Sequence, residues 1–172
     1  MLAVVGTAGH VDHGKSALLH ALTGSHPSHL PQEFSRGMTI DLGFASLSTA
    51  EDDEIGMIDV PGHERFLRNM VSSLWGLDLV LFVVAADEGW AALTQEHLRV
   101  VNALGLKHIM VAINKCDLAN EQQIQRIEEQ ILQKFLDQTD TLPDIWRVSC
   151  KTGDGIDDLR RAIIQQVRQI PE

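Results

Sequence analysis

The sequence predicts an α/β fold: a mostly parallel six-stranded sheet with helices on both faces and one antiparallel edge strand. Apolar segments of strand length alternate with segments of helical spacing along the whole chain, and such alternation implies right-handed crossovers between parallel strands. Residues 79–85 are continuously apolar, as expected of a central strand covered on both faces. A length of 172 residues suits one domain, so we expect a single domain over residues 1–172.

The individual elements can be placed in order. Strands are expected at residues 2–6, 39–49, 54–60, 79–85, 109–114 and 145–149, and the more alternating pattern of 39–49 suits the edge strand. A helix is expected over 17–22, and another ends at Gly105 because glycine commonly terminates helices. Residues 24–36 lack periodicity and are interpreted as a loop. Three further apolar stripes have helical spacing: Phe66, Leu67, Met70, Val71 and Leu74; Ile124, Ile127, Ile131 and Phe135; and Ile156, Leu159, Ile163 and Val167.

Composition excludes several classes of protein. With 24 acidic and 14 basic residues the net charge is −10, so a basic nucleic-acid-binding face is not expected within this chain. No apolar run approaches the roughly 18 residues of a membrane helix, and the start of the chain does not resemble a signal peptide. Two cysteines are too few for a disulfide framework, which fits a reducing compartment. We therefore expect a cytoplasmic protein without a membrane partner.

The segment from Gly9 to Ser16 carries the strongest chemical signal. It fits the phosphate-loop pattern G-x-x-x-x-G-K-[ST] and lies between an expected strand and an expected helix. Gly9 and Gly14 allow successive N–H groups to face phosphate oxygens, Lys15 adds a positive charge, and Ser16 offers a hydroxyl to Mg²⁺ at a helix start. His10 and His13 lie three residues apart, but the loop is already committed to phosphate rather than to a metal pair. The predicted nucleotide-binding residues here are Gly9, His10, Val11, Asp12, His13, Gly14, Lys15, Ser16 and Ala17.

Two further segments suit the γ-phosphate side of a nucleotide site. Thr39 follows the loop and can offer its hydroxyl to Mg²⁺ and its N–H to the γ-phosphate, although it can equally be a β-branched residue that begins an edge strand. Asp59 ends a strand, where a carboxylate can hold Mg²⁺ through water, and Gly62 can bring its N–H close to phosphate. An ordinary strand-to-helix turn is the alternative for this second segment. His63 can orient the attacking water or be a surface histidine at a helix start.

The next two segments predict a guanine-binding site. Asp117 can accept hydrogen bonds from guanine N1 and the 2-amino group, a donor pair that adenine lacks. The alkyl stem of Lys115 can lie on the purine face, and Asn114 can tie this loop to the phosphate loop. A plain loop after a strand is the alternative. In the last segment, made of Ser149, Cys150 and Lys151, a backbone N–H is expected to reach guanine O6, and Lys151 is expected to pack beside the base.

In this order, the segments GHVDHGKS, RGMTI, DVPGH, NKCD and SCK resemble the G domain of translational GTPases, which is a P-loop NTPase fold. Residues 36–44 (RGMTIDLGF), residues 58–66 and the short spacing from Lys15 to Thr39 are similar to the selenocysteine-specific elongation factor. This resemblance implies GTP and GDP as ligands and a ribosome-stimulated GTPase. It also implies that the full-length protein has the ribosome and an aminoacyl-tRNA, selenocysteinyl-tRNA, as partners. In this family β-barrel domains and often winged-helix domains follow the G domain.

The resemblance also implies roles for single residues. His63, Lys15 and Thr39 match catalytic positions, and Ser16, Thr39 and Asp59 match the Mg²⁺ positions. Val11 and Met38 match a hydrophobic gate that holds His63 away from the nucleotide, and Asp12 matches a residue near a monovalent cation, K⁺ or Na⁺. Residues 28–35 depart from the charged pattern usual in the family. Two alternatives remain at this point: another translational GTPase of initiation-factor type, or a GTP-dependent scaffold module without a translational role.

Overall fold

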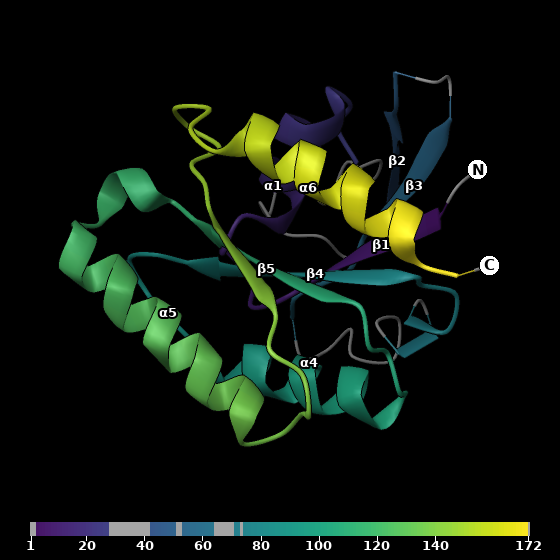
Figure 1. Ribbon diagram of the computed structural model, residues 1–172. Helices are drawn as coiled ribbons and strands as arrows, with labels where there is room; N and C mark the ends of the chain where they lie inside the picture. The colour runs from purple at the N-terminus through teal and green to yellow at the C-terminus, as the bar shows by residue number, and fades with distance from the viewer. Residues whose placement is uncertain (1–2, 28–41, 51–52, 64–70, 73, 172) are drawn as a thin grey trace.

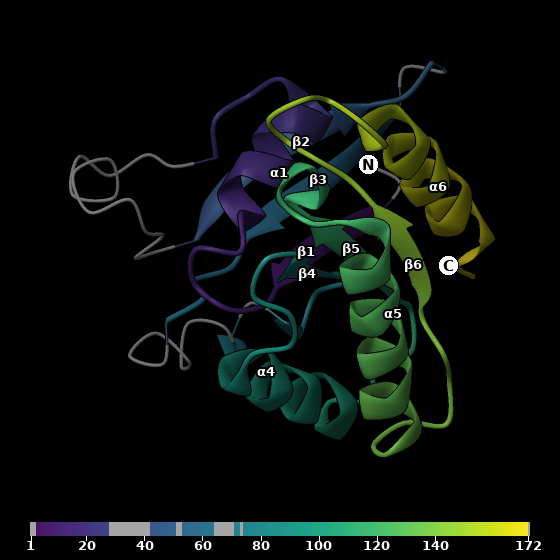
Figure 2. The ribbon, with the colours of Figure 1, turned by 90° about the vertical axis from the view of Figure 1, so that its left-hand side faces the viewer.

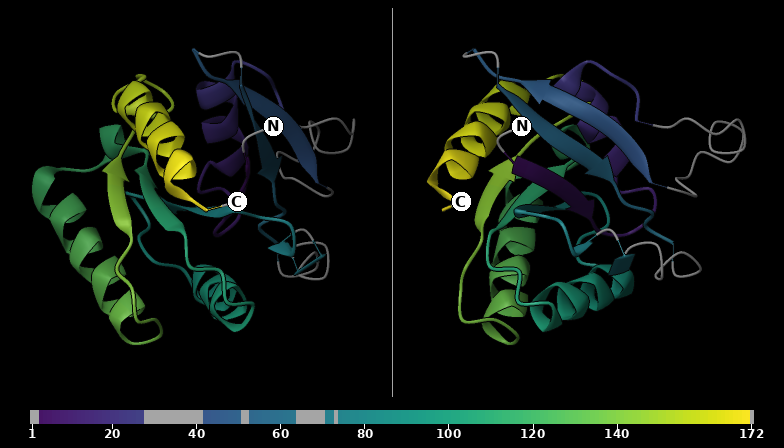
Figure 3. Two further views of the ribbon diagram at one scale, coloured as in Figure 1. Left: turned by 45° about the vertical axis from the view of Figure 1, so that its right-hand side comes forward. Right: turned by 90° about the vertical axis from the view of Figure 1, so that its right-hand side faces the viewer.

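The computed structural model describes residues 3–27, 42–50, 53–63, 71–72 and 74–171. Its six strands form one sheet in the order β2-β3-β1-β4-β5-β6. Strand β2 is antiparallel to β3, and the other four pairings are parallel, which confirms the predicted fold class. Figure 3 shows β2 and β6 at opposite edges of the sheet. The strands are β1 (Ala3–Ala8), β2 (Gly43–Ser48), β3 (Glu54–Asp59), β4 (Leu79–Ala85), β5 (Ile109–Asn114) and β6 (Asp144–Arg147).

Helices cover both faces of the sheet, as expected (Figure 1). Helices α1 (Lys15–Thr23) and α6 (Ile156–Gln169) lie on one face, and α4 (Ala92–Ala103) and α5 (Glu121–Leu136) lie on the other. Each face has its own hydrophobic core, and residues of β4 alternate between the two cores. The predicted apolar stripes of α5 and α6 are the buried residues of those helices.

Several strand ends differ from the prediction: β2 and β3 each end one residue earlier, at Ser48 and Asp59, and the ends of β1 and β6 differ by two residues. Strand β1 continues two residues beyond Gly6, because Thr7 and Ala8 pair with β4. Strand β6 spans Asp144–Arg147 rather than residues 145–149, because the Ser149 N–H turns away to donate to the carbonyl of Asp154. The edge strand begins at Gly43, and residues 39–41 of its predicted range lie outside the described residues, as does most of the stripe from Phe66 to Leu74.

Helix ends are fixed by local hydrogen bonds. Asn120 and Gln123 form a capping box at the start of α5, each side chain accepting a backbone N–H of the other residue. Arg160 of α6 donates to the carbonyls of Ala21 and Leu22 at the end of α1, so the two helices are joined where α1 leaves its last carbonyls unpaired. Gly105 has φ +72° just after α4, which confirms the predicted helix stop.

The parallel strands bring their carboxyl ends to one end of the sheet, and Figure 2 shows the molecule with this end toward the viewer. The start of α1, the short 3₁₀ helix η2 (Cys116–Leu118) and the loop between β6 and α6 lie together at this end. Ligands of open α/β sheets bind at this end, so the fold itself points to the site. Across the described part of the chain, no helix combines the length and apolar character that a membrane crossing requires.

Candidate nucleotide-binding site

The phosphate loop joins β1 to α1 through a backbone that requires glycine at two positions. Gly9 has φ +134°, and a Cβ there would lie 2.4 Å from the carbonyl oxygen of Val83. Gly14 has φ +94°, and its Cβ would lie 2.3 Å from Nδ2 of Asn114. Asp12 also has a positive φ, +65°, a conformation that aspartate tolerates better than most residues. The loop thus turns tightly into the N-terminus of α1, where unpaired N–H groups favour an anion.

Lys15 lies buried at the first position of α1. The residue is 6% exposed, and its Nζ donates to the carbonyl oxygen of His10 at 2.9 Å. Burial lowers the pKa of Lys15 to about 8, and the nearby carboxylates of Asp59 and Asp12 offset only part of this effect. A desolvated ammonium group gains from any further anion placed beside it. This arrangement therefore fits a phosphate group, as the sequence predicts.

Asp59 ends β3 and is fully buried beside the start of α1. Ser16 Oγ donates to Asp59 Oδ2 at 2.5 Å, and Thr7 Oγ1 donates to Asp59 Oδ1 at 3.3 Å. Thr7 Oγ1 in turn accepts the N–H of Val60 at 3.1 Å, so the carboxylate is held by β1 through Thr7 and by α1 through Ser16. A serine hydroxyl and a carboxylate in contact are the oxygen ligands that Mg²⁺ prefers, so these two residues fit the predicted cation. The third predicted ligand, Thr39, lies outside the described residues.

The loop after β3 approaches the phosphate loop closely. A Cβ on Gly62 would lie 2.1 Å from Lys15 Nζ and 2.9 Å from the carbonyl oxygen of Gly9. The backbone at residue 62 can come this near because it carries no side chain, which agrees with the expected role of its N–H. His63 follows and is half-buried, whereas Met38 of the predicted hydrophobic gate lies outside the described residues.

Asn114 joins the predicted base-binding loop to the phosphate loop. It is 2% exposed at the end of β5, and its Nδ2 donates to the carbonyl oxygen of His13 at 3.1 Å. The predicted tie between the two loops is thereby confirmed. Lys115 has φ +60°, so the chain reverses directly after the strand. Asp117 is exposed in η2 and accepts a hydrogen bond from Ser149 Oγ at 2.6 Å, which orients the carboxylate expected to bind guanine.

The loop after β6 contacts Asn114 and Asp117 through Cys150 and Ser149. The N–H of Cys150, which we expected to reach guanine O6, donates to Asn114 Oδ1 at 3.2 Å in this structure. To contact guanine O6, the Cys150 N–H would have to be shared between Asn114 Oδ1 and O6, or the N–H of Lys151 would have to take its place. The contact with O6 stays a prediction. Burial raises the pKa of Cys150 to about 11, so this thiol is protonated near neutral pH and acts as a small packed side chain. Lys151 is exposed beside the loop.

Two buried histidines support the phosphate loop, and the sequence predicts neither contact. The ring of His13 is fully buried: its Nδ1 accepts the N–H of Ala85 at 3.2 Å, and its Nε2 lies 3.3 Å from a carboxylate oxygen of Glu88. His97 of α4 accepts the N–H of Gly9 at 2.9 Å through Nδ1. Burial lowers the pKa of both imidazoles, and that of His97 falls to about 3. Both rings are therefore neutral acceptors behind the loop.

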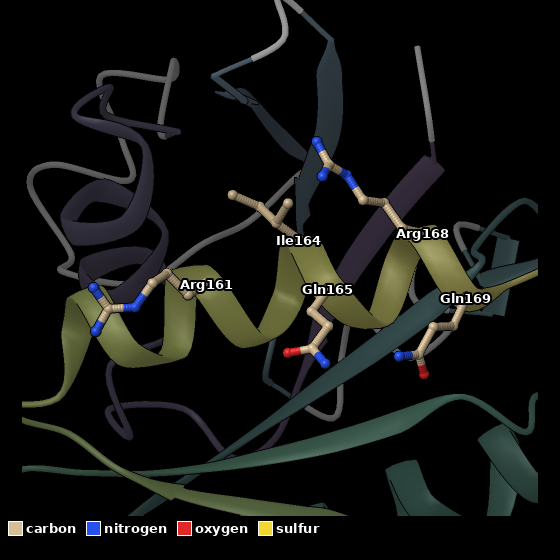
Figure 4. A pocket seen from close by; sticks show the side chains of 5 residues that line it. All are labelled: Arg161, Ile164, Gln165, Arg168 and Gln169. Carbon is tan, nitrogen blue, oxygen red and sulfur yellow. The ribbon is translucent and has the colours of Figure 1, made fainter.

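A separate concavity of about 350 Å³ lies on α6 (Figure 4). It is lined by one face of that helix and shares no residue with the loops described above. Two of its side chains are arginines, and one of these, Arg161, is paired with Asp158. The lining residues are Arg161, Ile164, Gln165, Arg168 and Gln169.

The sequence model of one family, described as the elongation factor Tu GTP binding domain, matches residues 2–169. The chain belongs to this family. Its match to the elongation factor Tu GTP-binding domain agrees with the mixed six-stranded sheet and with the phosphate loop at the strand ends.

Three curated relatives of this chain share one name. The chain is 43% identical over 169 residues to the selenocysteine-specific elongation factor of Desulfomicrobium baculatum, a match that covers 96% of this chain and 26% of that protein. It is 46% identical over 157 residues to that of Haemophilus influenzae, covering 91% and 25%. It is 40% identical over 162 residues to that of Escherichia coli, covering 94% and 26%. The chain thus spans about a quarter of the length of these relatives.

Solved structures show the same likeness. A bacterial selenocysteine-specific elongation factor, EF-Sec, superposes with a TM-score of 0.93 at 36% identity, covering 98% of this chain and 29% of that one. Translation elongation factor SelB from Methanococcus maripaludis, in complex with the GTP analogue GPPNHP, gives a TM-score of 0.84 at 32% identity, covering 99% and 34%. These relatives and solved structures are all named elongation factors, so they do not favour the initiation-factor and scaffold alternatives.

Proposed function

We propose that this chain is the GTP-binding and GTP-hydrolysing domain of a cytoplasmic elongation factor that delivers selenocysteinyl-tRNA to the ribosome. The observation that carries the nucleotide part is the buried Lys15, which is closed in by the loop of Gly62 and lies beside Asp59. The names of relatives at 40–46% identity support the selenocysteine part.

The residues of the phosphate loop would bind the nucleotide chiefly through charge and backbone N–H groups. Lys15 would offset negative charge on the β- and γ-phosphates, and the backbone around Gly14 would donate to their oxygens. Ser16 and Thr39 would hold Mg²⁺ directly and Asp59 through water, and the bound cation would supply further positive charge. Asp12 would lie near a monovalent cation, K⁺ or Na⁺.

Hydrolysis would depend on the loop that begins at Asp59. His63 would orient the attacking water once the ribosome has ordered this loop, with Val11 and Met38 as the gate that keeps the ring away beforehand. Thr39 would sense the γ-phosphate. Because the contributions are positioning and electrostatic, we expect slow hydrolysis by the isolated domain and faster hydrolysis with ribosomes.

Base recognition would come from the loops that Asn114 joins. Asp117 would accept the two guanine N–H donors, Lys115 and Lys151 would flank the base, and a backbone N–H near Cys150 would reach O6. Ser149 supports this role because it holds the Asp117 carboxylate at 2.6 Å. A hydrogen-bond pair of this kind discriminates strongly against a base that lacks it.

Calorimetric titration tests the nucleotide assignment. With Mg²⁺ present, GTP and GDP should bind and ATP should not, and comparable affinity for ATP would refute the guanine assignment. Asp117→Asn should shift preference from guanine to xanthine nucleotides. The exposed Asp137→Asn at the end of α5 is the matched control, and it should leave preference unchanged. His63→Ala should keep GTP affinity while lowering ribosome-stimulated hydrolysis.

The domain and cargo assignments need the full-length protein. We propose that residues 1–172 are one G domain and that β-barrel and winged-helix domains follow it in the natural protein. The coding sequence beyond Glu172 tests this directly. The GTP-bound full-length protein should then protect selenocysteinyl-tRNA from deacylation in preference to other aminoacyl-tRNAs. Equal protection of all aminoacyl-tRNAs would refute the cargo assignment.

A further inference from the structure

Gly9 is the point at which the phosphate loop leaves the sheet. The parallel pairing of β1 with β4 ends at Ala8, so the ladder no longer supplies an acceptor for the next N–H. A Cβ on Gly9 would lie 2.4 Å from the carbonyl oxygen of Val83, and a Cβ on Gly62 would lie 2.9 Å from the carbonyl oxygen of Gly9. The orientation of the Gly9 peptide therefore determines the direction in which the loop begins. It also determines how closely the backbone at Gly62 can approach the loop.

The acceptor for the Gly9 N–H comes from a helix 88 residues away in the sequence. His97 of α4 is 1% exposed and accepts this N–H through Nδ1 at 2.9 Å. Because Nδ1 is the acceptor, the imidazole proton resides on Nε2 and the ring is neutral. Burial, together with the nearby charges of Lys15 and His10, lowers the pKa of His97 to about 3, so the acceptor persists throughout the physiological pH range.

We propose that His97 is a positioning residue of the nucleotide site: its neutral Nδ1 holds the Gly9 N–H and thereby keeps the phosphate loop in its anion-binding conformation. The inference rests on the proposed function, since it concerns the affinity for the same guanine nucleotide. His97 itself belongs to α4 and to none of the motifs that identify the loop. Without the acceptor, the Gly9 peptide can turn toward water in the nucleotide-free protein, and binding must restore it.

Three variants separate this role from simple packing. His97→Leu keeps a buried apolar group of similar size and removes the acceptor, whereas His97→Asn places an amide oxygen near the position of Nδ1. Val101→Ala is the matched control, because Val101 is fully buried one turn further along α4. GDP affinity is measured by calorimetry on the 172-residue chain, and thermal stability is measured on the same samples.

We expect the Kd for GDP to rise about tenfold in His97→Leu, which corresponds to about 1.4 kcal/mol. His97→Asn should stay within about threefold of the parent, and Val101→Ala should lose stability with its Kd within about twofold of the parent. A parent-like Kd in His97→Leu would overturn the inference. Equal weakening in His97→Leu and His97→Asn would overturn it too, because the acceptor would then be irrelevant.

A second measurement on the nucleotide-free parent covers the case in which His97→Leu fails to fold. Nitrogen-15 spectra should show a His97 imidazole that is protonated on Nε2 only, together with a Gly9 amide that exchanges slowly with solvent. A fast-exchanging Gly9 amide or a protonated Nδ1 would overturn the inference without any reference to nucleotide. Failure of the parent itself to bind GDP would instead refute the proposed function, and the inference with it.

Discussion

Acidification should lower the free energy of unfolding of this protein through His97, and the substitution His97→Asn should remove this part of the pH dependence. The pKa of His97 is lowered from its ordinary 6.5 to about 3 because the ring is buried, with Lys15 and His10 adding to the effect. Below pH 6.5 the unfolded chain therefore binds a proton at this residue that the folded protein does not bind. Stability falls as pH decreases from about 6.5 toward 3, by about 1.4 kcal/mol per pH unit for one proton.

The expected size of this effect is well within reach of a denaturation experiment. Between pH 7.5 and pH 5.0 the contribution of His97 amounts to a loss of about 2 kcal/mol, compared with a total stability of roughly 5–15 kcal/mol for a typical domain. Urea unfolding of the parent and of His97→Asn at both pH values measures it. His97→Asn cannot titrate, so its loss on acidification should be smaller by about 2 kcal/mol.

The comparison isolates one residue because the other titrating groups remain in both proteins. His13, whose pKa burial also lowers, contributes equally to the parent and to the variant. Val101→Ala serves as the control, since it should lower stability by a similar amount at both pH values and leave the pH dependence of the parent unchanged. If the parent and His97→Asn lose the same free energy within about 0.5 kcal/mol, the neutral buried state of His97 is wrong.

Three further perturbations test other parts of the structure. Gly14→Ala should weaken GDP binding, measured by calorimetry, at least about tenfold. Residue 14 has φ +94°, and there is no space for an added Cβ. Gly24→Ala is the control: residue 24 has φ +76° with nothing within 4 Å of an added Cβ, so this change should lower stability and leave GDP affinity unchanged. Arg160→Ala removes two hydrogen bonds to the last carbonyls of α1 and should lower the urea-unfolding free energy by about 1–2 kcal/mol. Arg161→Ala, which removes only an exposed ion pair, should cost less than about 0.5 kcal/mol, and equal losses would contradict the bridging role of Arg160. The pKa of Cys150 is raised to about 11, so its thiol should react slowly with iodoacetamide at pH 8. Mass spectrometry of the alkylated protein should show a rate about a hundredfold lower in the folded protein than in the urea-unfolded chain.

The fold could be predicted because its central features are local in sequence. The continuous apolar run of β4 and the stripes of α5 and α6 each show their burial through spacing alone. The ends of β1 and β6 were misplaced because they depend on partners: Ala8 pairs with β4, and Ser149 turns toward Asp154. Such limits are set by tertiary hydrogen bonds, and neighbouring residues give no sign of them.

The residues that we propose to contact the nucleotide were predictable for a similar reason. Lys15, Asp59 and Asn114 belong to short motifs that can be recognised from neighbouring residues alone. The residues that orient these groups were not predicted. Thr7 reaches Asp59 across 52 residues and His97 reaches Gly9 across 88, and each of them has the sequence environment of an ordinary strand or helix residue.

The chemistry of the phosphate loop explains why a buried histidine suits the position behind it. The Gly9 N–H needs an acceptor, and a carboxylate there would place a negative charge close to Lys15 and compete with phosphate for its ammonium group. An imidazole accepts the same hydrogen bond without charge, and burial beside a lysine keeps it from protonating. His13 likewise accepts a backbone N–H, that of Ala85, through its Nδ1. Neutral imidazoles thus satisfy the N–H groups of Gly9 and Ala85 without a negative charge that would compete for Lys15, whose ammonium group we propose to bind phosphate.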